Sequence, residues 1–315
     1  MLQRHFPDVN SDWFAWKFEG DVSLPSVLVV AERDDRVVGF LSWTGREFHF
    51  EGKRTIGMLG GDAAIEFDHR NSGVFSQMLR DGHAILKEQP AADFIYGTVV
   101  RDASSLPGLL LAGYRPVCEL HWRIQSLLRI PHRRPERRKV SILSVEAPIS
   151  EAILRPAHSS AFLAWRYDHH PLFSYYSVDY GNHVAVFRRG RLRRIPVVFH
   201  MQSIAAKTTD CHASLAMDAL ARSQAMRGVA LLSLTAGNTD IGPLTKPRRF
   251  GRPVSRLLLV RNLSGRIPDA ILSDPGCWPI CAGMASNSMK QTSKESVRCS
   301  IRWAVRWASP AGSAT

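Results

Sequence analysis

The sequence predicts an α/β protein made of two mixed-sheet domains in tandem. The first observation is that β-branched runs alternate with amphipathic helical patterns along the first half of the chain. The second is that the same order of patterns returns in the second half. With 315 residues, of which 45% are hydrophobic, the chain is long enough to bury two ordinary cores, so disorder throughout is excluded.

The first half begins with aromatic residues at helical spacing, which predict a short helix over residues 13–18. Two β-branched runs on either side of Arg33-Asp34-Asp35 predict a hairpin over 27–32 and 36–43. The elements expected next are a strand over 56–67, a helix over 74–88, a strand over 92–100, a helix over 105–111 capped by Ser104, and a strand over 117–124. Together they predict a mixed sheet with helices packed on it.

The second half repeats this order. The run Phe162-Leu-Ala-Trp165-Arg166-Tyr167 is similar to Phe14-Ala-Trp16-Lys17-Phe18, and a strand pair follows each run. The later elements expected here are strands over 184–188 and 195–200, a helix over 212–226 and a strand over 228–235. This matched order predicts a tandem duplication, with domains over 1–128 and 142–272.

The formal net charge of +13 suits a partner that carries phosphates: nucleic acid, anionic lipid or a nucleotide cofactor. Much of this charge lies in residues 129–141, where two prolines interrupt a run of arginines. No aromatic residue lies between Trp122 and Phe162, and a nucleic-acid patch usually combines basic with stacking aromatic side chains. We therefore interpret residues 129–141 as a solvated basic linker and expect no specific nucleic-acid partner.

Residues 273–315 lose the alternation of the preceding segments and predict an irregular basic tail. Lys294, Arg298, Arg302 and Arg306 recur every four residues, so a basic helix on anionic lipid is the alternative to a solvated terminus.

Five cysteines, an odd number without zinc-ligand spacing, predict free thiols and no metal site. No apolar run is long enough to span a bilayer, and none opens the chain. These features together lead us to expect a cytoplasmic protein without a transmembrane segment.

The most informative segment is residues 65–75, which joins a strand to a helix through a turn with one glycine. Main-chain amides at the start of a helix have no intrahelical partner and lie at the positive end of its dipole, an arrangement that suits a pyrophosphate. Gly73 lacks a Cβ and so permits close approach, while Arg70 supplies a cation and Ser72 a hydroxyl. A plain strand-to-helix connection is the alternative interpretation.

This segment resembles the acyl-CoA loop of GNAT acetyltransferases, Arg/Gln-x-x-Gly-x-Gly/Ala, with Arg70 and Gly73 at the matching positions. Tyr96-Gly97 and the turn at residues 112–117, similar to the Gly-Phe-x-x-Val turn of that family, extend the resemblance to roughly residues 13–125. The block at residues 165–171 further resembles tandem GNAT proteins of the type associated with polysaccharide biosynthesis.

The resemblance implies an N-acetyltransferase that moves an acetyl group from acetyl-CoA to a small-molecule amine, such as an amino sugar or another metabolite. The amine would attack the thioester directly, so the protein must accept the amine proton, polarise the carbonyl and protonate the leaving thiolate. The implied cofactor-binding residues are Ile65, Glu66, Phe67, Arg70, Asn71, Ser72, Gly73, Val74 and Phe75.

Asp62 and Glu66 are the candidate general bases, because the two-residue period of a strand puts them on one face. Burial would raise either pKa toward neutrality, whereas solvated or capping carboxylates are the alternative. Tyr114 is a candidate proton donor, with packing in the core as its alternative.

The sequence departs from the family pattern at Phe75, where Gly or Ala is usual, and it has no tyrosine between Arg101 and Leu111. The first GNAT-like domain is also expected to lack its usual opening strand and helix. The junction at residues 207–212 has neither glycine nor arginine, so the second domain is expected not to bind CoA. The alternative function is a non-catalytic GNAT-like scaffold or CoA-binding protein.

Overall fold

The computed structural model describes residues 10–19, 24–88, 92–126, 154–179, 183–192, 195–205, 230–236, 256–278 and 302–307. The predicted linker at 129–141, the predicted helix at 212–226 and the junction at 207–212 lie outside the described residues.

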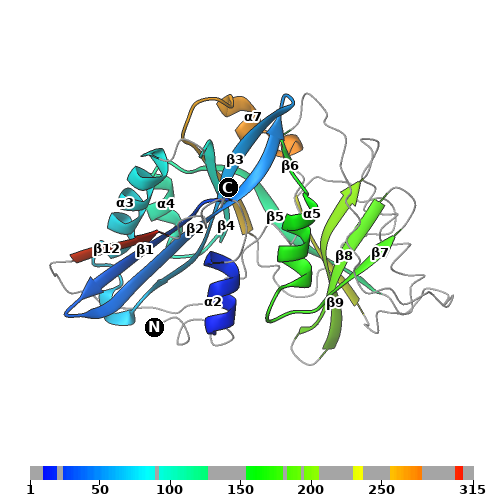
Figure 1. Ribbon diagram of the computed structural model, residues 1–315, viewed down its shortest axis with the longest axis horizontal. Helices are drawn as coiled ribbons and strands as arrows, with labels where there is room; N and C mark the ends of the chain where they lie inside the picture. The colour runs from blue at the N-terminus through cyan, green and yellow to red at the C-terminus, as the bar shows by residue number, and fades with distance from the viewer. Residues whose placement is uncertain are drawn as a thin grey trace, which may run out of the picture.

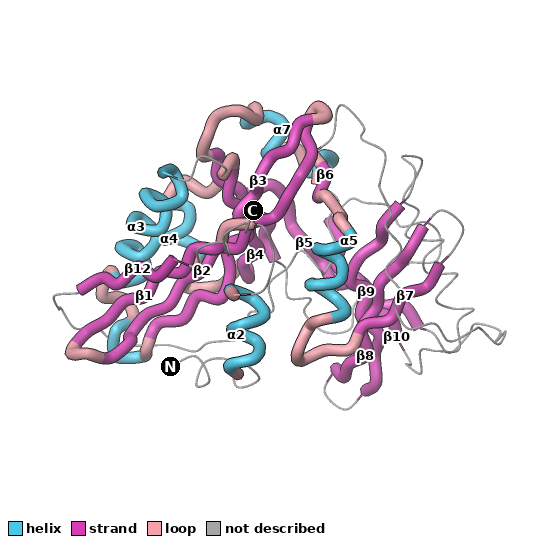
Figure 2. Tube along the Cα trace, viewed as in Figure 1, coloured by secondary structure: helices cyan, strands magenta, loops and turns pink. Residues whose placement is uncertain are grey.

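One mixed sheet runs through the described part of the molecule, in the order β12-β1-β2-β3-β4-β11-β5-β10-β9-β8-β7 (Figures 1 and 2). The pairs β3–β4 and β9–β10 are parallel, and the other pairs along this path are antiparallel. The strands are β1 (Ser26–Arg33), β2 (Arg36–Phe50), β3 (Lys53–Ile65), β4 (Phe94–Val100), β5 (Arg115–Ser126), β6 (Arg155–Pro156, paired with β2), β7 (Tyr175–Asp179), β8 (His183–Leu192), β9 (Ile195–Ala205), β10 (Ala230–Ala236), β11 (Arg256–Asn262) and β12 (Arg302–Trp307).

The strand order has an internal symmetry. If β1–β5 are exchanged with β7–β11, the order from β1 to β7 maps onto itself, and each pair keeps its parallel or antiparallel sense. The centre of this symmetry is the antiparallel pair β5–β11, and each of these two strands lies beside the other half's parallel pair. The predicted division into domains 1–128 and 142–272 stays a prediction, but residues 256–262 contribute their strand beside β4.

Helices α3 (Val74–Glu88) and α4 (Leu106–Leu111) pack on the sheet of the first half (Figure 1). Apolar residues three or four positions apart give α3 one buried face, which packs on Val29, Trp43 and Ile95 among others. A Cβ on Gly82 would lie 2.2 Å from the Trp43 ring, so only glycine allows this helix to approach so closely. The cap expected at Ser104 is wrong, because the residue preceding α4 is Ser105, which makes no side-chain capping bond.

A second core joins the two halves. Phe48, Phe94 and Tyr96 from first-half strands pack with Tyr167 and with Trp278, which follows the helices α7 (Asp269–Ser273) and η3 (Pro275–Cys277). These apolar side chains come from segments far apart in sequence. The two halves therefore share this core and bury apolar surface against each other.

Helix α2 (Ser11–Phe18) and the second-half helix α5 (Ser160–Leu163), which continues as the π-helical turn η2 (Ala164–Asp168), lie in the middle of the molecule (Figure 1). Trp16 Nε1 donates to the carbonyl of Trp165 over 2.8 Å, and Trp165 Nε1 donates to the carbonyl of Trp16 over 2.7 Å. The two rings stack with centroids 4.8 Å apart. These reciprocal contacts give the two similar sequence runs equivalent positions.

The prediction of an irregular tail is wrong at residues 302–307, and so is its helical alternative. These residues form β12, whose register pairs Val27 with Trp307 and Glu32 with Arg302. The pattern was misleading because the pairing partner lies at the other end of the chain. The first half therefore has an edge strand beside β1 that residues 302–307 supply.

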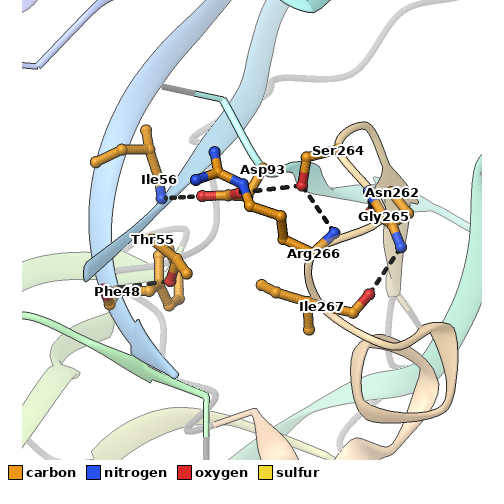
Figure 3. A network of polar contacts seen from close by, with 9 residues as sticks. All are labelled: Phe48, Thr55, Ile56, Asp93, Asn262, Ser264, Gly265, Arg266 and Ile267. Atoms are coloured by element: carbon orange, nitrogen blue, oxygen red, sulfur yellow. Dashed lines mark hydrogen bonds and ion pairs between the residues drawn. The ribbon is translucent and has the colours of Figure 1, made fainter. Parts of the chain in front are cut away.

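A buried carboxylate ties the segment after β11 to the first-half sheet (Figure 3). Asp93 is 1% exposed, and it accepts hydrogen bonds from the Ile56 amide at 2.9 Å and from Ser264 Oγ at 3.0 Å. Arg266 Nε lies 2.6 Å from the same carboxylate. Asp93 thus connects the starts of β3 and β4 to the turn at Gly265.

No helix in the described ranges is both long and apolar enough to cross a membrane.

Candidate functional site

The turn between β3 and α3 presents a row of open main-chain amides. After the short helix η1 (Phe67–His69), the amides of His69 and Arg70 bond within the turn, and the next amide with a backbone acceptor is that of Gln77. Within the described structure, the amides of residues 71–76 have no hydrogen-bond acceptor. Such a row at the positive end of a helix dipole attracts anions.

The sign of the backbone φ angle alternates along this row. Asn71 and Gly73 have positive φ angles of 59° and 84°, whereas Ser72 between them does not. Alternation in the sign of φ is typical of anion-binding nests, in which successive N–H groups turn toward a common point. A Cβ on Gly73 would meet nothing within 4 Å, so the space in front of the nest is open.

Phe75 does not obstruct this turn. A Cβ on Gly108 of α4 would lie 3.2 Å from the Phe75 ring, so the aromatic side chain lies against α4. The first turn of α3 therefore keeps its amides open, although Phe75 replaces the smaller residue expected there. Gly108 provides the room and was not identified from the sequence.

Two side chains expected to bind phosphate are used partly to build the turn. Ser72 Oγ donates to the carbonyl of His69 over 2.6 Å, and the role of this hydroxyl toward a ligand stays a prediction. Arg70 Nε donates to the carbonyl of Ile65 over 3.2 Å, and its guanidinium lies 5.4 Å from the Phe67 ring centroid. Val74 is buried in the core under the turn, which leaves its amide as its open group.

The edge of β3 that leads to the turn is open toward β4. The parallel ladder joins Gly57–Leu59 to Phe94–Tyr96 and then stops, although β3 continues to Ile65 and β4 to Val100. A Cβ on Gly97 would lie 2.9 Å from the carbonyl oxygen of Gly60, so this glycine allows the close contact where the ladder ends. Beyond it, β3 has no ladder partner on this side in the described structure.

Asp62 lies at a β-bulge on this open stretch. Gly61 pairs with Ser42 and Ala64 pairs with Phe40, so one residue of β2 opposes two residues of β3. Asp62 has a φ of 48°, which interrupts the extended backbone. The expectation that Asp62 and Glu66 share a face through an unbroken two-residue period is therefore wrong.

The Asp62 side chain is 9% exposed and forms an ion pair with Lys17 of α2. Ser42 Oγ lies 3.4 Å from the same carboxylate. Burial, together with the positive charges of Arg166 and Arg46, lowers the pKa of Lys17 to about 7. The structure thus places an amine with a lowered pKa beside Asp62 on the open stretch of β3.

Of the other two residues predicted to transfer protons, Glu66 directly follows the end of β3 and Tyr114 is buried in the core. The Glu66 amide donates to the carbonyl of Val38 over 2.9 Å, so this main-chain group is already used in the fold. Tyr114 is buried, and its hydroxyl lies 3.1 Å from His83 Nε2 and 3.5 Å from Trp43 Nε1. Burial raises the pKa of Tyr114 to about 12, and burial with the charge of Arg261 lowers that of His83 to about 3. This environment matches the packing alternative for Tyr114.

The sequence reasoning did not single out Lys17. Its signal was a lone charged residue between Trp16 and Phe18, both of which are buried. The bulge had a signal as well, since two adjacent glycines, Gly60 and Gly61, inside a strand often mark a bulge or a close backbone approach. Among the described residues, no group of three or more His, Cys, Asp or Glu is arranged to hold a metal ion.

Comparison with known proteins identifies the fold. No protein-family model matches the sequence, and no curated protein matches it. A GCN5-related N-acetyltransferase from Anabaena variabilis has a similar structure, with 12% identity and a TM-score of 0.55 over 83% of this chain and 68% of that chain. A protein from Enterococcus faecalis described as a probable N-acyltransferase matches with 13% identity and a TM-score of 0.55 over 84% of this chain and 68% of that chain.

A GCN5-related N-acetyltransferase from Kribbella flavida matches with 11% identity and a TM-score of 0.50, over 79% of this chain and 63% of that chain. The chain therefore has the mixed α/β fold of GCN5-related N-acetyltransferases. At these identities the likeness concerns the fold alone.

Proposed function

We propose that this chain, with its GCN5-related fold, is an N-acetyltransferase that moves an acetyl group from acetyl-CoA to an amine. The observation that carries the proposal is the row of open amides at residues 71–76, reached along an open edge of β3. A nest of this kind needs a ligand with clustered negative charge, and a pyrophosphate supplies it.

In this proposal the pyrophosphate of CoA lies against the amides of 71–76, in front of Gly73. The pantetheine arm runs beside β3 where the ladder with β4 has ended, because unpaired main-chain groups there are able to bond its amides. The thioester then lies toward the bulge at Asp62. The proposed cofactor contacts leave out two of the groups expected from the sequence, the amide of Glu66 and the hydroxyl of Ser72, because each already makes a hydrogen bond within the chain.

Asp62 and Lys17 form the proposed proton-accepting pair. In the fraction of molecules with a neutral Lys17, its amine accepts a proton from the acceptor ammonium, and Asp62 holds the resulting charge. The freed amine attacks the acetyl carbon and forms the carbon–nitrogen bond as the carbon–sulfur bond breaks. CoA leaves as a thiolate, which takes up the proton that the new amide nitrogen loses. We assign no catalytic role to Tyr114, whose hydroxyl lies in the core.

We also propose that the two halves arose by tandem duplication. The strand order is symmetric about the β5–β11 pair, and Trp16 and Trp165 make reciprocal hydrogen bonds from similar sequence runs. These two observations are independent, because one concerns backbone pairing and the other side-chain contacts. The second half then completes the structure and borders the acceptor side of the first.

Two measurements test the function. Calorimetric titration with acetyl-CoA measures binding, and release of free CoA thiol in the presence of a panel of amines measures transfer. Binding together with amine-dependent thiol release supports the enzyme. Binding without release for any amine supports the alternative, a non-catalytic CoA-binding protein with the same fold, and absence of binding overturns both.

A further inference from the structure

An arginine in the second half carries buried N–H groups that have no acceptor in the described part of the structure. Arg188 of β8 has its Nε and Nη1 atoms buried, and no acceptor bonds them in the part of the chain that the structure describes. A buried guanidinium without acceptors is costly, because it has lost water and gained no hydrogen bond in return. Such a group is accounted for if a ligand supplies the acceptors.

The surroundings of Arg188 fix its orientation. Its guanidinium lies 4.1 Å from the Phe173 ring centroid and 5.1 Å from that of Phe199. The strand register sets Tyr175 of β7 and Phe199 of β9 on either side of it. Contacts with two aromatic rings hold the guanidinium in place, an arrangement that is common where arginine binds a planar oxyanion.

The groups near Arg188 add positive charge. Burial and the charges of Arg166 and Arg188 lower the pKa of His170 to about 3, which keeps this imidazole neutral. Arg166 belongs to the π-helical turn η2, and such turns occur often at functional sites. The guanidinium of Arg166 also lies 5.9 Å from the Trp16 ring centroid, and its charge contributes to the lowered pKa of Lys17. The positive region therefore continues to the proposed reaction centre.

We propose that Arg188, with Arg166 beside it, binds a carboxylate or phosphate group of the acceptor, so that the acceptor is an amine bearing a compact oxyanion. The specificity part of this inference rests on the proposed acetyl transfer, whereas the anion site stands on the geometry of Arg188. Guanidinium groups bind both carboxylates and phosphates through paired hydrogen bonds, so the two classes share this chemistry. The amine of such an acceptor then points toward Lys17 and Asp62.

The test measures anion binding without acetyl-CoA. Calorimetric titrations use inorganic phosphate in one arm and acetate in the other, and thermal unfolding is followed with and without each anion. The variant is Arg188→Gln, and its matched control is Arg189→Gln, the next residue on the same strand, which is exposed. Both are made in a Gly73→Asp background, so that phosphate binding at the amide nest does not contribute.

We expect the Gly73→Asp protein, with or without Arg189→Gln, to bind at least one of the two anions. With Arg188→Gln added instead, the same anion should bind at least about tenfold more weakly. The arm with tighter binding distinguishes carboxylate from phosphate.

Equal anion binding by the two variants, or no binding of either anion by the Gly73→Asp protein, overturns the proposal. Arg188→Lys is the second variant, because it keeps a positive charge beside the Phe173 and Phe199 rings but loses the paired N–H groups of the guanidinium. Anion binding by Arg188→Lys that equals that of Arg189→Gln also overturns the proposal. None of these outcomes depends on acetyl-CoA, so the site and the proposed enzymatic function are tested separately.

Discussion

Replacing Gly73 with aspartate should abolish acetyl-CoA binding, whereas the same replacement at Gly52 should not. Both glycines have a left-handed backbone, with φ of 84° and 70°, and a Cβ at either position meets nothing within 4 Å. Each substitution should therefore cost about 1–2 kcal/mol of folding free energy through backbone strain. Gly52 lies in the β2–β3 turn, so only the Gly73 substitution introduces a carboxylate beside the open amides.

The size of the effect follows from Coulomb's law. A carboxylate about 4 Å from a phosphate charge, at an effective dielectric constant near 20, is repelled by about 4 kcal/mol. That energy corresponds to roughly a thousandfold weaker binding. Blockage of the amides by the new side chain adds to the loss. Calorimetric titration of acetyl-CoA into both variants measures the difference, and thermal unfolding checks that their stabilities match.

The comparison separates ligand binding from folding. If Gly73→Asp and Gly52→Asp bind acetyl-CoA with equal affinity, the nest is not the pyrophosphate site and the reasoning from open amides is refuted. Weaker binding by both variants together with equal loss of stability would likewise assign the effect to strain rather than to the nest.

Three further predictions concern stability. Asp93→Asn should lower the free energy of unfolding by about 2 kcal/mol in urea, because Arg266 and the Ile56 amide lose a charged acceptor; an unchanged value would contradict this. In a double-mutant cycle, Trp16→Ala and Trp165→Ala should show a coupling energy of about 1 kcal/mol by denaturant unfolding, because their rings stack with centroids 4.8 Å apart; simple additivity would exclude a contribution from this stacking. Burial lowers the pKa of His83 in the folded protein to about 3 from its ordinary value of 6.5, so between these pH values the unfolded chain binds one proton more at this residue. The contribution of His83 to the free energy of unfolding should therefore be fully present above pH 6.5 and fall by about 1.4 kcal/mol per pH unit toward pH 3. Thermal unfolding at a series of pH values should show a smaller pH dependence for His83→Gln than for the unsubstituted protein.

The local part of the fold was predictable from the sequence. The hydrophobic period defined α3 at residues 74–88 with its observed bounds, and the polar turn at Asp34-Asp35 separated β1 from β2 as expected. These elements depend on neighbours in sequence, such as turn residues and the spacing of apolar side chains. The position of Gly73 before α3 was predictable for the same reason.

Long-range pairing was not predictable in this way. β11 and β12 are defined by partners far away in the chain, so their own patterns did not reveal their places beside β4 and β1. The environment of Asp62 also depends on tertiary structure, since its bulge and its ion pair with Lys17 require β2 and α2 to be in place. The orientation of the Ser72 hydroxyl toward His69 likewise follows from the three-dimensional turn, which spacing does not specify.

The place of β11 between β4 and β5 affects how the protein is made. As the chain leaves the ribosome, the position between β4 and β5 in the sheet has no strand until residues 256–262 are translated. At ordinary elongation rates this happens roughly 8–30 seconds after the translation of β4. The edge-strand position beside β1 is occupied later still, when residues 302–307 emerge. During that interval unpaired strands are exposed to other nascent chains, so the growing polypeptide is a natural client for chaperones. Severing the two halves would make this temporary vulnerability permanent.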